Sequence, residues 1–268
     1  MSWVIVTYVG YLLGQALSAY KWQVLARPLG FAQPLHVFTM YYFSGMYLNL
    51  FAPSTVAGDF GRSALLARSG GELAAAVQSV LADRVSGLVM LVWVCAVSGL
   101  LTDRGVLPFT VRYGIVAAAL APTVGWFVLP ALVRRTLIVS RKLHDFVEKL
   151  ITPYQQAPLI LGRACGLSLV FHLFQMGLQI FLASALHIEV SAWILMVYIA
   201  LVNILSNLPI SFGGIGVREG GYVMLLTPLG VEHEQALAFG LLWSAVILVA
   251  NATGGLALLF APAAKETL

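Results

Sequence analysis

The chain has 268 residues, of which 60% are hydrophobic and 10% are charged, and its mean hydropathy is +0.91. A soluble domain has about 45–50% apolar and about 25% charged residues, so this composition excludes an ordinary water-soluble enzyme, a disordered chain and a nucleic-acid-binding protein. The formal net charge of +4 comes from loop lysines and arginines, which in a membrane protein report orientation. We therefore expect residues 1–268 to form a single all-α, multi-pass domain in the plasma (inner) membrane.

A transmembrane helix needs about 20 mainly apolar residues, and seven segments are candidates. In chain order they are Trp3–Tyr20, Leu35–Ala52, Leu73–Leu101, Val111–Val133, Ala157–Leu186, Val190–Pro209 and Glu234–Pro262. Lys21, Arg27 and the basic residues that begin at Arg134 are expected on the cytoplasmic side, because cytoplasmic loops are rich in Lys and Arg. The acidic connections near Glu189 and Glu232 are expected outside.

Residues 134–156 combine basic side chains with apolar residues at near-helical spacing. This pattern predicts an amphipathic helix that lies in the cytoplasmic interface. A solvated connector whose only role is topology is the alternative.

The loop charges also predict an even number of membrane crossings within residues 35–72 and again within residues 190–230. Two broken, re-entrant hairpins that enter from opposite faces satisfy this count. Two spanning pairs satisfy it as well.

Both predicted hairpins contain a similar break. The stretches Asn49–Arg62 and Asn207–Glu219 each run Asn-Leu, then Pro, then a Gly-rich stretch that reaches Arg with an acid nearby. Proline stops a helix and glycine permits unusual backbone shapes. Matching breaks in two halves of a membrane protein point to an internal inverted repeat and to a transporter's substrate site, although external turns are the simpler alternative. The residues expected at the breaks are Asn49, Pro53, Gly58, Gly61, Asn207, Pro209, Gly213, Gly214 and Gly216.

Asp83 and Arg84 lie about ten residues inside the third segment. A charge near the bilayer centre costs at least ~2.5–3.5 kcal/mol and usually has a partner. We expect Asp83 to pair with Arg62 or Arg218, and Arg84 to pair with Asp59 or Glu219. These residues form either a structural ion-pair network or a site for a charged head group, since arginine suits bidentate phosphate binding. The substrate-binding candidates are Asp59, Arg62, Asp83, Arg84, Arg218 and Glu219.

His172, Gln175 and Gln179 fall on one face of the fifth segment. They line a polar cavity or, as is more common, form hydrogen bonds between helices. The sequence has no spacing typical of a metal site and no catalytic constellation, so neither a metal nor a cofactor is expected. It also lacks a Walker A motif, which argues against direct use of ATP.

With these residues in view, the chain resembles the transmembrane-region family of lysylphosphatidylglycerol synthase, which includes the membrane half of the multiple peptide resistance factor. One block is Asn49–Arg68 with the pair Asp83-Arg84 downstream, and the other is Pro209–Leu226. Where the family often has Pro-Gly-Gly, this chain has Ser211-Phe212-Gly213-Gly214, a small departure that leaves Arg218-Glu219 in register. Compared with the family, the chain is expected to begin at the second helix.

The resemblance implies movement of a lipid or lipid-linked head group between leaflets, with an anionic phospholipid or a lipid phosphate as partner. In this interpretation the three candidate arginines bind phosphate, and the three candidate acids hold the arginines or bind a cationic head group. Asn49 and Asn207 satisfy backbone groups at the breaks. Lysine transfer belongs to a separate soluble domain of the full synthase, and the chain ends at Leu268, six residues after Pro262. No enzyme activity is therefore expected.

Two other functions remain open at this point. One is a membrane enzyme or enzyme subunit that acts on a polyprenyl phosphate, with Asp83 or Glu219 as base, although the divalent-metal motif that such chemistry usually needs is missing. The other is a scaffold for a neighbouring enzyme, such as one of aminoacyl-lipid metabolism, with residues 134–156 as its docking face. A partner enzyme or a homo-oligomer is compatible with each reading.

Overall fold

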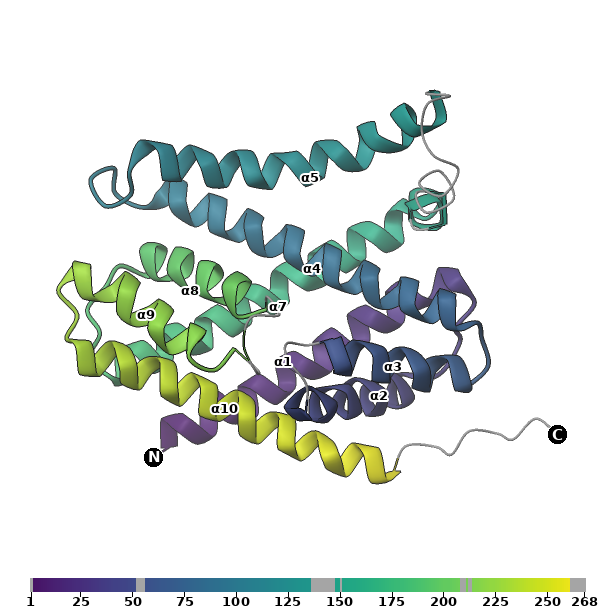
Figure 1. The fold of residues 1–268 in the computed structure, drawn as a ribbon, viewed down its shortest axis with the longest axis horizontal. Coiled ribbons are helices and arrows are strands. Elements are labelled where there is room, and N and C mark those ends of the chain that lie inside the picture. Colours follow the sequence, from purple (N-terminus) through teal and green to yellow (C-terminus); the bar gives the residue numbers. More distant parts are fainter. Residues whose placement is uncertain are drawn as a thin grey trace.

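The computed structural model describes residues 2–51, 56–135, 148–149, 151–207, 211 and 214–260, and this part of the chain is helical, with no strand (Figure 1). Its α-helices are α1 (Ser2–Ala26), α2 (Leu35–Leu48), α3 (Val56–Arg68), α4 (Leu73–Leu101), α5 (Phe109–Arg135), α7 (Pro158–Ala185), α8 (Ala192–Ser206), α9 (Val217–Leu226) and α10 (His233–Phe260). The 3-10 turns η1 (Arg27–Leu29), η2 (Asn49–Phe51) and η3 (Thr227–Leu229) follow α1, α2 and α9. Most of the amphipathic segment predicted at 134–156 lies outside the described residues.

Four helices in the described part of the chain are long and apolar enough to cross a membrane: Leu73–Leu101, Phe109–Val128, Pro158–Ala185 and His233–Phe260. The sequence predicted seven such segments, and all seven are helical where they are described. However, α2 and α8 contain 14 and 15 residues, which correspond to about 21 and 22 Å at 1.5 Å per residue. A hydrocarbon core is about 30 Å thick, so neither helix can span it alone.

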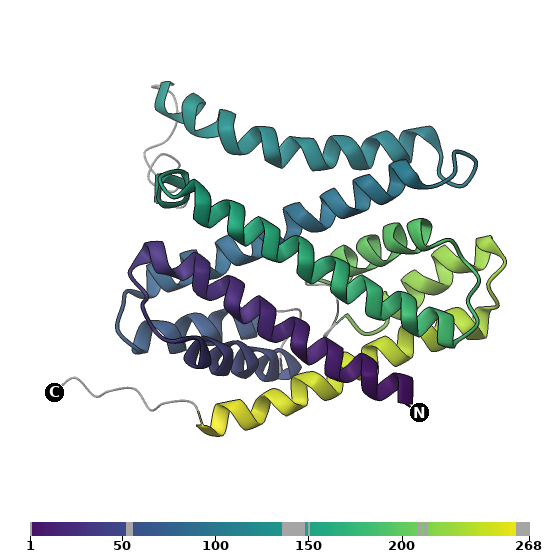
Figure 2. The same cartoon turned by 180° about the vertical axis from the view of Figure 1, so that it is seen from behind.

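The helices form two halves with reciprocal contacts. α1 and α7 pack side by side and run in opposite directions (Figures 1 and 2). The last helix of each half packs on the second helix of the other, since α4 contacts α8 and α10 contacts α2. Helices α1–α4 and α7–α10 are therefore related by an approximate two-fold arrangement, and α5 lies outside it, along α4.

Each half contains a hairpin of two short helices. α2 and α3 pack on each other at one end of the molecule, and α8 and α9 do so at the other end (Figure 1). The end of α2 and the start of α3 point toward the middle of the molecule, and so do the end of α8 and the start of α9 (Figures 1 and 2). The helix ends that flank the two breaks therefore face the centre of the fold.

Two apolar clusters support the two hairpins. The larger one surrounds α8, whose Val197, Ile199 and Val202 are completely buried in a helix that packs on α4 and α9. The smaller one joins α1 to the first hairpin, where the rings of Trp22 and Phe38 pack edge to face with centroids 4.8 Å apart. Each hairpin thus has its own apolar support, which positions the polar groups between them.

Candidate functional site

Asp83 lies at the centre of a buried charged cluster formed by α1, α3 and α4. It is ten residues from the start of α4, about 15 Å along the helix axis, which is roughly half the thickness of a hydrocarbon core. Its Oδ1 is 2.8 Å from Lys21 Nζ and its Oδ2 is 3.0 Å from Arg62 Nη2. All three residues are at most 6% exposed, so each charge depends on its partners rather than on water.

Asp59, in the first turn of α3, extends this cluster toward the surface. Arg84 Nε and Nη2 each donate to the Asp59 carboxylate at 2.8 Å, in the two-pronged geometry that makes arginine–carboxylate pairs strong. Arg62 Nη2 donates to the same carboxylate at 3.0 Å. The side chain of Arg84 is 40% exposed, and it is the accessible edge of the cluster.

Aromatic rings complete the surroundings of Arg62. Its guanidinium carbon lies 4.9 Å from the ring centroids of both Trp22 and Tyr42, within the range of cation–π attraction. The Trp22 indole N–H is itself held by Ser79 Oγ at 2.9 Å. Arg62 Nη1 is buried and has no hydrogen-bond partner among the described residues, so one donor of this arginine is not satisfied by that part of the protein.

The charges of this first cluster do not balance. It contains three cationic side chains and two acidic ones, which leaves a formal excess of +1: Lys21, Arg62, Arg84, Asp59 and Asp83. An unbalanced charge at membrane depth is unfavourable. An anion that approaches through the exposed edge at Arg84 would neutralise the excess.

The first break positions α3 through close backbone contact. Gly58 and Gly45 bring α3 and α2 so near that a Cβ on Gly58 would lie 2.3 Å from the Gly45 carbonyl oxygen. Asn49 Oδ1 accepts a hydrogen bond from the Gly58 N–H at 2.8 Å, which satisfies a free donor at the start of α3. Gly61 leaves room for Leu48, since a Cβ there would lie 2.2 Å from its Cδ1. Pro53 lies outside the described residues.

The second hairpin holds a cluster made of hydrogen bonds. Arg218 Nη1 donates to Ser244 Oγ at 2.9 Å, and the Ser244 hydroxyl donates to Glu219 Oε1. Glu219 Oε2 accepts from the Gly216 N–H at 2.6 Å and so caps the start of α9. A Cβ on Gly240 of α10 would lie 2.8 Å from Glu219 Cα, so this glycine lets α9 approach.

The backbone of the second break also requires glycine. Gly214 and Gly216 have φ values of +80° and +84°, a region that residues with a Cβ rarely adopt. Asn207 Nδ2 donates to Asn203 O at 2.8 Å, within its own helix. Pro209 and Gly213 lie outside the described residues.

The polar stripe on α7 links helices. His172 Nε2 lies 2.8 Å from Gly87 O, Gln175 Nε2 donates to Tyr11 O at 3.4 Å, and Gln179 Oε1 accepts from the Tyr222 hydroxyl at 2.7 Å. These contacts match the predicted alternative of hydrogen bonds between helices. Gln175 Oε1 and Gln179 Nε2 are buried without a partner in the described part of the structure, so a role in lining a cavity stays a prediction.

Of the pairings left open by the sequence, the structure forms Asp83 with Arg62 and Arg84 with Asp59. Arg218 and Glu219 belong to the other hairpin. Tyr11 on α1 packs edge to face against Trp243, the neighbour of Ser244 on α10, with ring centroids 5.6 Å apart.

The structure corrects the predicted position of Lys21. It was expected as a cytoplasmic loop charge after a helix that ends at Tyr20, but α1 continues to Ala26 and buries Lys21 against Asp83. A lysine near the end of an apolar run looks the same whether it snorkels to the interface or turns inward. Ser244 was also missed, because a single serine in an apolar helix carries no pattern. Among the described residues no group of His, Cys, Asp or Glu could hold a metal ion.

Comparison with known proteins gives one family. The family model described as "Lysylphosphatidylglycerol synthase TM region" matches residues 1–255, and it confirms the resemblance seen in the sequence. Neither a curated protein nor a solved structure matches the chain.

Proposed function

Because the chain belongs to the lysylphosphatidylglycerol synthase transmembrane-region family, we propose that it moves a lipid with a phosphate-bearing head group between the two leaflets of the plasma (inner) membrane. The observation that carries this proposal is the excess positive charge of the first cluster, at membrane depth and beside a broken hairpin. A phosphate would bind Arg84 and the free Nη1 donor of Arg62, while the acyl chains stay in the hydrocarbon. The charge of the head group would then stay paired with protein side chains while the lipid moves from one leaflet to the other.

The short helices support two re-entrant hairpins. α2 and α8 are too short to cross a bilayer, and each is followed by a short helix that returns to the end from which it came (Figure 1). The helix ends that flank each break point toward the centre of the protein (Figure 1), and a break at membrane depth is tolerated where protein surrounds it. Hairpins that enter from opposite faces give a head group a polar route from either side.

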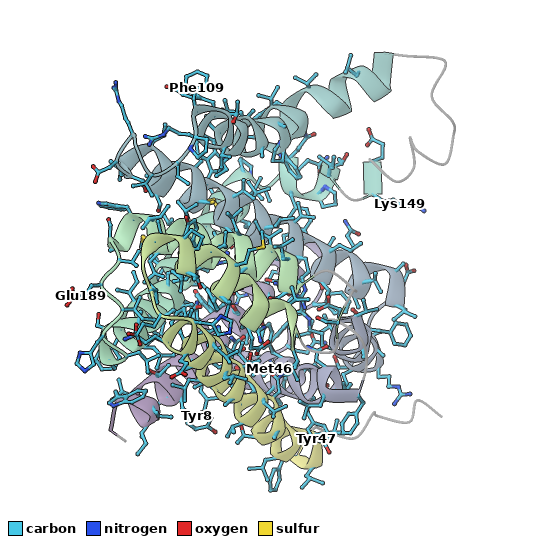
Figure 3. All side chains as sticks on the ribbon, turned by 60° about the vertical axis from the view of Figure 1, so that its left-hand side comes forward. Tyr8, Met46, Tyr47, Phe109, Lys149 and Glu189 are labelled. Carbon is cyan, nitrogen blue, oxygen red and sulfur yellow. The ribbon has the colours of Figure 1, made fainter. Side chains whose placement is uncertain are left out.

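The charges at the two ends of the molecule support an orientation. Lys149 and Glu189 lie at opposite ends (Figure 3). The α1–α2 and α3–α4 connections, with Arg27 and Arg68 at their starts, lie at the end with Lys149 (Figure 1). The α4–α5 and α9–α10 connections lie at the other end, and they contain Asp103, Arg104 and Glu232. By the positive-inside rule, the first hairpin enters from the cytoplasmic face and the second from the external face.

Both candidate bases of the alternative enzyme function are already engaged. Asp83 is ion-paired with Lys21 and Arg62, and Glu219 accepts hydrogen bonds from Gly216 and Ser244. Transport therefore fits these contacts better than base catalysis.

The test is lipid translocation by purified protein in liposomes. Fluorescent phosphatidylglycerol, its lysyl ester or a polyprenyl-phosphate sugar is placed in one leaflet, and its appearance in the other leaflet is followed. We expect wild type to translocate at least one of these lipids and Arg84→Ala to do so roughly tenfold more slowly, because a hydrogen bond to a charged group contributes about 1.5 kcal/mol.

Arg104→Ala is the matched control, since Arg104 is an exposed arginine in the loop between α4 and α5, far from the centre. It should translocate at the wild-type rate. Equal rates for Arg84→Ala and Arg104→Ala would show that no phosphate binds at the first cluster. If folded wild type translocates none of the three lipids, the transport function itself is wrong.

A further inference from the structure

A second feature of α4 lies on the side away from the charged cluster. Side chains of α4, α5 and α7 enclose a cavity of about 260 Å³, with lining residues that include Ala82, Val85, Val89, Trp126, Phe127 and Cys165. At 3.6 residues per turn, this face of α4 lies roughly 130° around the helix from Asp83. The cavity is therefore separate from the candidate phosphate site and shares one helix with it.

The hydroxyl groups in the cavity wall are already used by the protein. Ser86 Oγ donates to Asp83 O at 3.1 Å, Thr123 Oγ1 donates to Ala119 O at 3.0 Å, and the Tyr154 hydroxyl donates to Leu25 O at 3.0 Å. A polar ligand would lose its hydrogen bonds to water and gain few in return. These contacts therefore select an apolar occupant.

The mouth of the cavity faces the surface that the membrane would cover. Leu81, Val85 and Phe127 line it and are 41%, 49% and 71% exposed. α5 packs mainly along α4 at the outside of the molecule (Figures 1 and 2), so the cavity beside it lies near the surface of the helix bundle. A partner helix, about 10–12 Å across with its side chains, is too wide for this volume, whereas a single hydrocarbon chain is not.

We propose that this cavity holds one acyl or prenyl chain of the lipid whose phosphate binds the first cluster, an inference that rests on the proposed function. Ser86 lies between the two sites. It lines the cavity, and its hydroxyl donates to the backbone carbonyl oxygen of Asp83. A lipid anchored in this way keeps one chain against α4 while its head group reaches Arg84. The cavity thereby favours lipids that have a flexible hydrocarbon chain over free phosphate compounds.

The experiment is photolabelling of the full chain in liposomes that contain phosphatidylglycerol with a diazirine near the end of one acyl chain. After irradiation, mass spectrometry locates the adducts. We expect adducts on cavity residues of α4, α5 and α7, and loss of these adducts in Ala82→Phe, whose ring fills the cavity. Ala117→Phe is the matched control, because Ala117 is exposed on the other side of α5, and its adducts should equal those of wild type.

Adducts spread evenly over lipid-facing residues such as Leu13 and Leu256, and insensitive to Ala82→Phe, would overturn the proposal. Translocation of the same lipid is measured in parallel to separate the two hypotheses. Cavity labelling without translocation by wild type would refute the transport function and still support a hydrocarbon site. An Ala82→Phe variant that loses the adducts but translocates at the wild-type rate would show that the cavity does not hold the transported lipid.

Discussion

Arg62 and Arg218 occupy comparable places in the two hairpins, each on the short helix that follows a break, but their partners differ. Arg62 is ion-paired with Asp83, the eleventh residue of α4, and Arg218 donates to Ser244, the twelfth residue of α10. The position of α10 that corresponds to Asp83 is occupied by Trp243, and the position of α4 that corresponds to Ser244 is occupied by Arg84. One scaffold therefore carries direct ion pairs in one half and two opposite charges bridged by a serine hydroxyl in the other.

This difference indicates a division of roles at the centre. The first half has three cations for two acids, so it is suited to attract an anion. In the second half Arg218 and Glu219 are joined through Ser244, and their charges cancel. We expect head-group binding to depend on the first hairpin, and the second to act mainly as its structural counterpart.

The largest expected effect comes from removal of Asp83. Asp83→Ala leaves Lys21 and Arg62 buried beside an apolar side chain, and the loss of one partner of a buried ion pair costs about 3–5 kcal/mol. In detergent, thermal unfolding of this variant should occur at a clearly lower temperature than that of wild type. Glu219→Ala is the matched change in the second half and should cost less, because Arg218 keeps its bond to Ser244. Equal losses would refute the contrast between the halves.

A smaller effect is expected when Ser244 is changed. Ser244→Ala removes the hydroxyl that bridges Arg218 and Glu219. Because the two opposite charges remain next to each other, we expect a net cost of about 1.5–3 kcal/mol, that of a single hydrogen bond to a charged group. Thermal unfolding should shift by less than for Asp83→Ala, and translocation of phosphatidylglycerol should stay near the wild-type rate. A translocation loss as large as that of Arg84→Ala would place the second cluster on the head-group path.

The smallest effect concerns the glycines of the two hairpins. In Gly58→Ala the new methyl group meets the Gly45 carbonyl, which is backbone and cannot turn aside, whereas in Gly221→Ala it meets the Val202 side chain at 3.1 Å. Overpacking costs about 1–3 kcal/mol, so Gly58→Ala should unfold at a lower temperature than Gly221→Ala. If the order were reversed, the close approach of α2 and α3 would not be what positions the first cluster.

Much of this architecture could be predicted from residue patterns. Long apolar runs can satisfy their backbone only as helices, and the predicted segments correspond to α1, α2, α4, α5, α7, α8 and α10. The pairs of Asp83 with Arg62 and of Arg84 with Asp59 were among the alternatives because a charge inside an apolar segment must find a partner. The family followed from the two Gly-rich blocks.

Other features depended on contacts that no pattern reports. The sequence showed seven apolar runs, but α2 and α8 are too short to span a membrane. The breaks that follow them were visible in the sequence, but the exact helix ends at Leu48 and Ser206 were not, and the predicted apolar runs continued past both. Ser244 became part of the site because α10 passes over α9 at Gly240, a contact between residues far apart in the sequence.

The sequence by itself determined that this is an all-helical membrane protein with two similar breaks and with charged residues inside apolar segments. These features can be read from each segment alone, because the hydrophobicity of a segment and the cost of placing a charge in it do not depend on which helices pack beside it. Only the tertiary structure decided that Lys21 turns inward to Asp83, that the first cluster carries an excess positive charge and that the second is neutral. The reason is that a charge balance is a sum over neighbours, and Lys21, Arg62 and Asp83 become neighbours only when α1, α3 and α4 pack together.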